Sequence, residues 1–320
     1  MARPSRAASP DGVVRGVRIG QAESPRGQSG VTAVIFDRPV PVVVDHRGGA
    51  SGTYDIASLA LDATFGRRWA LFFSGGSLFG LDAASGIRQQ ILEAGGGVPV
   101  FQNPNRVVPI AGAVLFDLPR RVGGLPDYRG LGYEAARRAT ASRVAVGRVG
   151  AGAGATVGKY LGRASAMHGG LGWAASRIGI GTVGALVALN AVGAVRDPSS
   201  GRWVAGARGP ARKIVPPAFV GALPRDETST TLGLILTDLD VDRSVLLRAA
   251  AIAHAALGGV IVPFHTATDG DTMFAASTGE AGPPPEESRP GEVADRLGLS
   301  AAQCAVQATL TAVRVANRAG

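Results

Sequence analysis

The sequence predicts an α/β or α+β fold, and two observations carry that prediction. Stretches typical of strands alternate loosely with stretches of helical periodicity along the 320 residues, and no internal repeat is visible. Hydrophobic residues make up 46% of the chain and aromatic residues 5%, so the core has to be built from Ala, Val, Leu and Ile. A chain of this length is long enough for one large domain or two small ones.

Apolar runs bounded by Gly and Pro mark the expected strands. Residues 31–37 and 40–49 are expected to form two strands joined by a proline-containing turn, and residues 67–97 a strand, a glycine turn and a helix. The further expected elements are a strand region at 99–118, a short helix at 132–142, a strand and glycine loop at 142–162, a buried strand at 179–197, a strand at 230–240, a helix at 242–260 and a terminal helix.

Three segments are expected to lack regular structure. Residues 1–15 contain no apolar segment and predict a disordered tail, so that residues 16–320 form a single domain. Residues 196–229 are rich in Pro, Gly and charge and predict a long loop within the folded chain, and residues 280–292 form a second Pro-rich loop. Loops as long as the one at residues 196–229 are usually functional or flexible.

The net charge of +9 raises the question of a nucleic-acid partner. Lys159 and Lys213 are the two lysines and every other basic residue is Arg, a skew that is typical of a GC-rich genome when Ala and Gly are also abundant. The basic residues are scattered, and few aromatic residues accompany them as stacking platforms. We therefore expect no nucleic-acid partner.

Cysteine usage and apolar segments indicate the compartment. Cys304 is the one cysteine, so no internal disulfide forms, and its helical context predicts a small buried side chain. The N-terminus has no apolar segment of the secretory type. The long apolar run at 178–195 contains four glycines and an Asn and has no aromatic belt, which favours a buried strand and turn over a membrane helix. A cytoplasmic location without a membrane partner is expected.

Two near-motifs for nucleotides and for serine catalysis fail on inspection. Residues 152–160 resemble a phosphate-binding loop, but Ala153 stands at the first glycine position and Tyr160 at the magnesium-binding hydroxyl. Ser77 lies in a segment that resembles a nucleophile elbow, yet Phe79 occupies the place of a required glycine. Ser77 remains a minor candidate nucleophile.

Metal-binding spacings fail as well. Asp238, Asp240 and Asp242 have the spacing of a calcium loop, but no Gly follows at the sixth position and Ala249 replaces the bidentate Glu. The histidines show no zinc spacing; they are His46, His168, His254 and His265. No metal and no organic cofactor is expected.

A run of hydroxyl side chains, from Thr228 to Thr231, stands where the loop at 196–229 meets a strand. Such residues are most often turn or edge residues. A second interpretation is that Thr230 is a nucleophile, because cleavage of the chain before it would create an α-amine that acts as its base. The long preceding loop suits self-cleavage, since it has to present the Ser229 carbonyl and then leave the pocket.

Seven sequence blocks resemble the P1 peptidases (peptidase family S58), which include L-aminopeptidase/D-esterase, β-aminopeptidase and nylon-oligomer hydrolase. The blocks occur in order between about residues 30 and 315: VDHRGGASGTYD, SGGSLFGLDAASGI, VPIAGAVLFDL, GAGAGATVGK, ALNAVGAVRDPSSG, STTLGLILTD and PFHTATDGDTMFAASTG. The resemblance implies a four-layer αββα sandwich of the N-terminal-nucleophile type, as in the aminopeptidase/ornithine acetyltransferase group. It also implies self-cleavage, amide hydrolysis without a cofactor, and assembly into tetramers or larger homo-oligomers.

The resemblance assigns Thr230 as nucleophile and the bond between Ser229 and Thr230 as the cleavage site, giving an α chain 1–229 and a β chain 230–320. Many relatives have Asn before this bond where this chain has Ser229. Asn is not chemically required, because the attack falls on the carbonyl. Several relatives also have a Tyr that assists the oxyanion where this chain has Phe116, which has no donor.

The remaining assignments are also carried over from the family. Lys159 matches the lysine beside the nucleophile, where a buried ammonium would lower the pKa of the Thr230 amine; otherwise it is a solvated surface lysine. Asn190 matches the donor to the developing oxyanion; otherwise it caps a turn. Asp269 and Asp271 match an acidic pair that orients the nucleophile; otherwise they form an Asx turn.

The sequence thus predicts a self-processing amide hydrolase that acts on small aminoacyl amides or oligoamides. The blocks around Lys159 and Asp269 favour 6-aminohexanoate (nylon) oligomers. Two alternatives stay open. One is a β- or L-aminopeptidase or D-esterase without nylon activity, and the other is an unprocessed, non-catalytic binding protein with the same fold.

Overall fold

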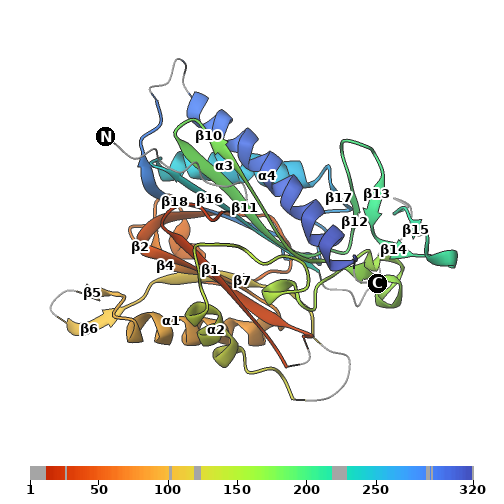
Figure 1. The fold of residues 1–320 in the computed structure, drawn as a ribbon, viewed down its shortest axis with the longest axis horizontal. Helices are drawn as coiled ribbons and strands as arrows, with labels where there is room; N and C mark the ends of the chain where they lie inside the picture. The colour runs from red at the N-terminus through yellow and green to blue at the C-terminus, as the bar shows by residue number, and fades with distance from the viewer. Residues whose placement is uncertain are drawn as a thin grey trace.

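The structure, a computed structural model, describes residues 12–25, 27–100, 103–118, 124–217, 229–285, 289 and 291–318. Helices cover both outer faces of two stacked layers of strands (Figure 1). The layer of α1 and α2 lies on one side and that of α3 and α4 on the other. The helices are α1 (Ala83–Glu93), α2 (Tyr128–Arg137), α3 (Arg243–Leu257) and α4 (Glu292–Ala316). The predicted αββα sandwich is confirmed.

In the described part of the chain, the strand layers form one nine-stranded hydrogen-bonded sheet that folds over on itself. Its strands are β1 (Val17–Glu23), β2 (Gly30–His46), β3 (Gly52–Tyr54), β4 (Arg67–Ser74), β7 (Ile110–Val114), β10 (Gly170–Ile178), β11 (Gly181–Asn190), β16 (Thr230–Leu239) and β18 (Thr272–Gly282). Their order is β10–β11–β16–β18–β2–β4–β7–β3, and β1 pairs with β2.

Short elements complete the chain. The short strands are β5 (Val98–Val100), β6 (Asn103–Val107), β8 (Thr156–Val157), β9 (Met167–His168), β12 (Ala194–Arg196), β13 (Trp203–Ala205), β14 (Ala207–Arg208), β15 (Ile214–Val215) and β17 (Ile261–Val262). The 3₁₀ turns are η1 (Ala57–Leu59), η2 (Ser77–Asp82), η3 (Gly150–Gly152), η4 (Lys159–Leu161), η5 (Arg163–Ser165) and η6 (Pro210–Arg212).

Strand β2 joins the two layers and corrects one prediction. The sequence predicted two strands and a turn at 31–49, but the structure has one strand of 17 residues. Its first part pairs with β4 and its last part with β18, and the register shifts between Ile35 and Val40. Pro39 lies in this shift, where a residue without an N–H does not interrupt the ladder. The proline therefore marks a bend within a strand and not a turn between two strands.

The apolar core has three parts, one for each contact between layers. Phe73 and Phe274 meet between the two strand layers, with ring centroids 6.3 Å apart. Strand β16 places Leu234 in this central part and its neighbour Ile235 in the part beneath α3 and α4. The third part lies beneath α1 and α2 and includes Ile87. Because β11 and β16 are buried on both faces, their sequences are nearly continuous apolar runs.

The outer segments agree with the sequence in part. Residues 1–11 of the predicted tail and residues 218–228 of the long loop lie outside the described residues. At the end of the predicted tail, Val14 is buried and Arg15 contacts Asp238 at 2.6 Å. Cys304 is buried on α4, as predicted. In the described ranges, no helix is long and apolar enough to cross a membrane.

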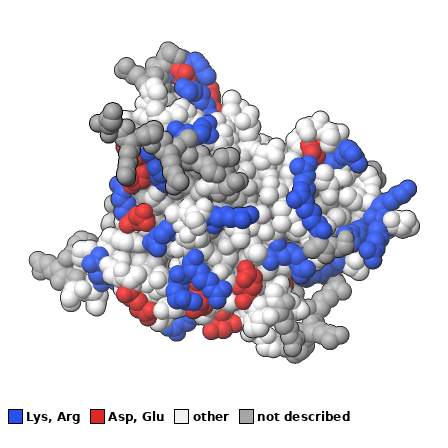
Figure 2. Space-filling view, in the orientation of Figure 1, with Lys and Arg blue, Asp and Glu red and all other residues white. Residues whose placement is uncertain are grey.

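Charged side chains are distributed over the face that Figure 2 shows. Basic and acidic side chains alternate over much of this face, and a denser basic group lies on the side of β12–β15.

Candidate active site

Strands β11, β16 and β18 bring the predicted nucleophile and its partners to one place. Thr230 is the first residue of β16, and it lies opposite Asn190, the last residue of β11. One residue earlier, Ser229 bridges to Asp269 and so extends the parallel pairing of β16 with β18. The side chains of Thr230, Asn190 and Asp269 are buried. Ladder pairing of buried strands thus fixes the position of the Ser229–Thr230 peptide bond.

The Ser229 carbonyl oxygen accepts two hydrogen bonds. The Thr230 hydroxyl donates to it at 2.6 Å, and the Gly270 N–H donates to it at 2.9 Å. The predicted nucleophile therefore contacts the peptide group that precedes it. A Cβ atom at position 270 would lie 2.7 Å from Thr230 Oγ1, so the close approach requires glycine.

Lys159 and Asn190 form a buried pair beside this bond. Lys159 Nζ donates to the Asn190 main-chain oxygen at 2.8 Å and to Asn190 Oδ1 at 2.9 Å. Asn190 Nδ2 donates to the main-chain oxygen of Phe116 at 2.9 Å. Gly158, with φ of 77°, makes the turn that places Lys159 here. Lys159 is 2% exposed, so the structure excludes the alternative of a solvated surface lysine.

The two predicted carboxylates accept hydrogen bonds from different groups. Asp271 Oδ1 accepts from the Thr231 N–H at 2.6 Å, whereas Asp269 Oδ2 accepts from the Thr266 N–H at 2.9 Å. Burial raises the pKa of Asp269, and the neighbouring Asp271 carboxylate raises it further. Asp271 therefore contacts the residue after the predicted nucleophile, and burial favours the protonated form of Asp269.

A glycine-rich segment holds the turn that carries these carboxylates. The N–H groups of Gly48 and Ala50 donate to the main-chain oxygens of Asp271 and Asp269, at 3.0 and 2.9 Å. A Cβ atom on Gly48 would lie 2.2 Å from the main-chain nitrogen of Asp271. The glycines in the VDHRGGASG block thus permit a backbone contact that no other residue would allow.

A cavity of about 240 Å³ opens onto the Ser229–Thr230 bond. Leu78, Val114 and Phe116 supply apolar surface, and Ser51 and Ser77 supply hydroxyl groups. No charged residue lines the cavity among the described residues. Ser77 forms no hydrogen bond with a histidine or a carboxylate within those residues, so its environment does not resemble that of an activated serine.

Asp117 lies behind one wall of this cavity. Its Oδ1 accepts from Ser29 Oγ at 3.0 Å and from the Gly76 N–H at 2.7 Å, next to Ser77. Tyr128 shares the Ser29 hydroxyl at 3.0 Å. Burial raises the pKa of Asp117 to about 6 and that of Tyr128 to about 12. This buried cluster holds the Gly75–Gly76 turn in place.

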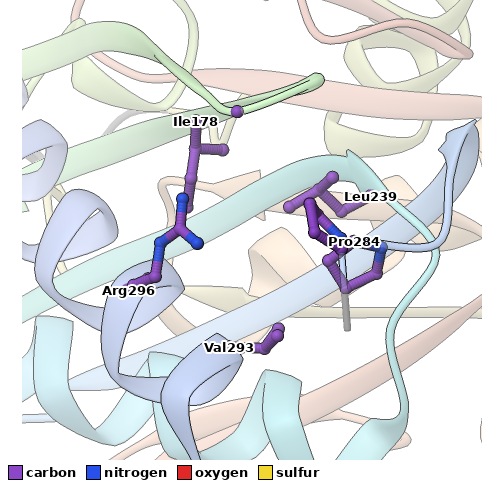
Figure 3. A pocket seen from close by; sticks show the side chains of 7 residues that line it. Ile178, Leu239, Pro284, Val293 and Arg296 are labelled. Carbon is purple, nitrogen blue, oxygen red and sulfur yellow. The ribbon is translucent and has the colours of Figure 1, made fainter. Parts of the chain in front are cut away.

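A second cavity lies at the opposite end of β16 (Figure 3). Its volume of about 20 Å³ suffices for roughly one water molecule. Its lining contains one charged side chain, that of Arg296, and no nucleophile. The residues labelled in Figure 3 are Ile178, Leu239, Pro284, Val293 and Arg296. The cavity at Thr230 is the candidate substrate site, because the predicted nucleophile lies in its lining.

Several buried polar atoms near Thr230 have no hydrogen-bond partner within the described residues. They are Ser229 Oγ, Thr231 Oγ1, Asp269 Oδ1 and His265 Nε2. Such atoms are rare in folded proteins, and each calls for a physical explanation, of which a catalytic role is one. His265 was not predicted to belong to this site, although it lies in the same sequence block as Asp269. No group of three or more potential metal ligands occurs in the ranges that the structure describes.

The chain is similar to known proteins over most of its length. The pattern of peptidase family S58 matches residues 13–320. An uncharacterized aminopeptidase of Mycobacterium tuberculosis is 37% identical over 306 residues, covering 89% of this chain and 85% of that protein. A 6-aminohexanoate-oligomer endohydrolase of a Kocuria species is 30% identical over 297 residues, covering 89% of this chain and 79% of that protein.

Solved structures share the fold at lower identity. The L-aminopeptidase D-Ala-esterase/amidase from Ochrobactrum anthropi, described as a variant of the Ntn hydrolase fold, aligns with a TM-score of 0.66 and 19% identity. The alignment covers 98% of this chain and 88% of that one. A Burkholderia β-aminopeptidase aligns with a TM-score of 0.63 and 21% identity, covering 93% and 84%.

Proposed function

Because the chain belongs to peptidase family S58 and is a hydrolase of amide bonds, we propose that it activates itself by cleavage between Ser229 and Thr230. The observation that carries the proposal is the contact of the Thr230 hydroxyl with the Ser229 carbonyl, which also accepts the Gly270 N–H. Donors aimed at a carbonyl oxygen stabilise the negative charge that develops there during attack.

Self-cleavage proceeds by an N-to-O acyl shift. Thr230 Oγ attacks the Ser229 carbonyl carbon and forms an ester bond, while the peptide C–N bond breaks. The proton of the hydroxyl is transferred to the nitrogen of the new Thr230 amine. The resulting ester is hydrolysed by water, which leaves a carboxylate on Ser229 and a free hydroxyl on Thr230. The β chain then begins at residue 230.

Amide hydrolysis repeats this chemistry on a substrate. The Thr230 amine takes the proton of its own hydroxyl, and the hydroxyl attacks the substrate carbonyl. The substrate oxygen takes the place of the Ser229 oxygen and accepts the Gly270 N–H, with the second N–H of the Asn190 amide as a further donor. The Lys159 ammonium beside Asn190 lowers the pKa of the amine, so that the amine remains a free base.

The substrate is proposed to be a small aminoacyl amide or a linear oligoamide. A cavity of about 240 Å³ with apolar walls and the hydroxyls of Ser51 and Ser77 suits a short, largely apolar acyl group. The blocks at Lys159 and Asp269 favour 6-aminohexanoate oligomers, whereas the relative at 37% identity is named an aminopeptidase. Both substrate types therefore belong in the first test.

The test is to incubate the purified protein with 6-aminohexanoate oligomers and with aminoacyl p-nitroanilides, beside Thr230→Ala and Thr230→Ser variants. We expect release of product by wild type and by the serine variant, and none by the alanine variant. Cleavage of the anilides without oligomer turnover would exclude the nylon substrate. Absence of turnover on every substrate by a fully cleaved protein would contradict the proposed use of Thr230.

A further inference from the structure

Asp271 connects His265 to the strand that carries the nucleophile. Its Oδ1 accepts from the Thr231 N–H at 2.6 Å, and its Oδ2 contacts the N–H and Nδ1 of His265 at 3.1 and 2.9 Å. An ionised carboxylate only accepts hydrogen bonds, so Nδ1 of His265 carries the proton. Because both oxygens have donors, the orientation of the carboxylate depends on His265 as well as on Thr231.

The ring of His265 is held on two further sides. It stacks on Phe264 with centroids 3.9 Å apart, and it meets the edge of His254 at 4.6 Å. His254 in turn contacts Asp45 Oδ2 at 3.0 Å through Nδ1, and Arg47 donates to the same oxygen at 2.8 Å. The ring is therefore held by Phe264 and by His254 of α3, and His254 is in turn held by Asp45 near the end of β2.

The backbone at His265 adopts an uncommon conformation. Its φ of 57° lies in the left-handed region, which residues other than Gly adopt uncommonly, with Asn, Asp and His the most frequent among them. Such a conformation costs free energy and persists where the surrounding structure enforces it. It places both the N–H and Nδ1 of His265 on one oxygen of Asp271.

We propose that His265 is a positioning residue for Thr230. Its Nδ1–H fixes Asp271, Asp271 fixes the N–H of Thr231, and the nucleophile is thereby held against the carbonyl that it attacks. His265 does not itself exchange a proton with the substrate. This inference rests on the proposed function, since it takes Thr230 as the nucleophile.

The test uses substitutions that separate the donor from the ring. His265→Asn keeps a side-chain donor near the position of Nδ1 and tolerates positive φ, whereas His265→Gly tolerates positive φ without a donor. His265→Leu keeps bulk without a donor. Phe264→Leu is the matched control, because it removes the stacked ring and leaves the His265–Asp271 contact.

For variants that lack the donor, we expect kcat and the rate of self-cleavage to fall by about 10²-fold with KM unchanged, the effect of a small misplacement of a reacting group. His265→Asn should stay within about threefold of wild type, and Phe264→Leu likewise. If the leucine variant does not fold, the comparison of His265→Asn with His265→Gly decides the question.

Two results would overturn the inference while the proposed function stands. One is wild-type kcat and self-cleavage in His265→Gly. The other is an equal loss in His265→Asn and His265→Gly, which would mean that the ring acts by packing. A wild-type protein that neither cleaves itself nor hydrolyses amides would instead refute the proposed function, and this inference with it.

Discussion

Gly270→Ala is the substitution that most directly perturbs the proposed self-cleavage. The added Cβ atom would lie 2.7 Å from Thr230 Oγ1, 3.0 Å from the Cα of Ser51 and 3.1 Å from the main-chain oxygen of Ala50. Two of these neighbours are backbone atoms and move little. Either the Thr230 hydroxyl is displaced, or the backbone at 270 retreats and lengthens its 2.9 Å hydrogen bond to the Ser229 oxygen.

The size of the effect follows from the role of that hydrogen bond. Loss of one donor to a developing oxyanion typically slows a reaction by about 10²–10³-fold, or about 2.7–4 kcal/mol of activation free energy. We therefore expect self-cleavage of Gly270→Ala to be at least about 10²-fold slower than that of wild type. Gly259→Ala is the matched control, because its nearest neighbour would be 3.5 Å from the added Cβ.

The assay is a time course of cleavage after cell-free synthesis, with full-length and cleaved chains resolved by denaturing electrophoresis. The thermal midpoint of each variant, measured in parallel on the Thr230→Ala background, separates slow chemistry from poor folding. Cleavage of Gly270→Ala at the wild-type rate, with the fold intact, would refute the argument that the Gly270 N–H stabilises the oxyanion.

Three further predictions concern buried polar groups. Burial raises the pKa of Asp117 to about 6, so the folded protein binds a proton between about pH 4 and 6 that the unfolded chain releases, and stability falls as pH rises through that window. Urea denaturation of Asp117→Asn should show that the unfolding free energy at pH 4 minus that at pH 7 is about 3 kcal/mol smaller than in the wild type. An unchanged value would contradict this prediction. Lys159→Met removes the donor to two Asn190 oxygens and should lower the free energy of unfolding by about 3 kcal/mol in the same measurement. The control is Lys213→Met at an exposed position, which should change this free energy very little. Equal effects of the two substitutions would exclude a structural role for Lys159. Burial raises the pKa of the Cys304 thiol to about 11, so the native protein should not react with a thiol reagent at pH 8 until urea unfolds it. Fast reaction of the native protein would contradict this and would show that α4 opens readily.

Much of the fold was predictable because β11 and β16 are buried on both faces. Their apolar runs mark them as strands without any tertiary information. The bend in β2 was not predictable in this way, because Pro39 gives the same local signal in a turn and in a bulge. Pairing with β4 and β18, which is a long-range effect, decides between them.

The candidate site was predictable to the extent that it depends on residue types. The blocks that contain Thr230, Lys159, Asn190 and the Asp269 turn were singled out from the sequence, and the structure brings them together. The Gly270 N–H was not predictable, because the direction of a backbone donor leaves no trace in the residue type. The role inferred for His265 depends on a left-handed backbone and on side-chain contacts with Asp271 and His254, which the residue types alone do not encode.

Cleavage between Ser229 and Thr230 underlies every step proposed for Thr230, and intact-mass analysis of the purified protein under denaturing conditions detects it. We expect two species, with the smaller one beginning Thr-Thr-Leu-Gly on N-terminal sequencing, and a single uncut species for Thr230→Ala. A single full-length species from the wild-type protein would contradict the proposed function, because Thr230 would then have no free amine to act as its base.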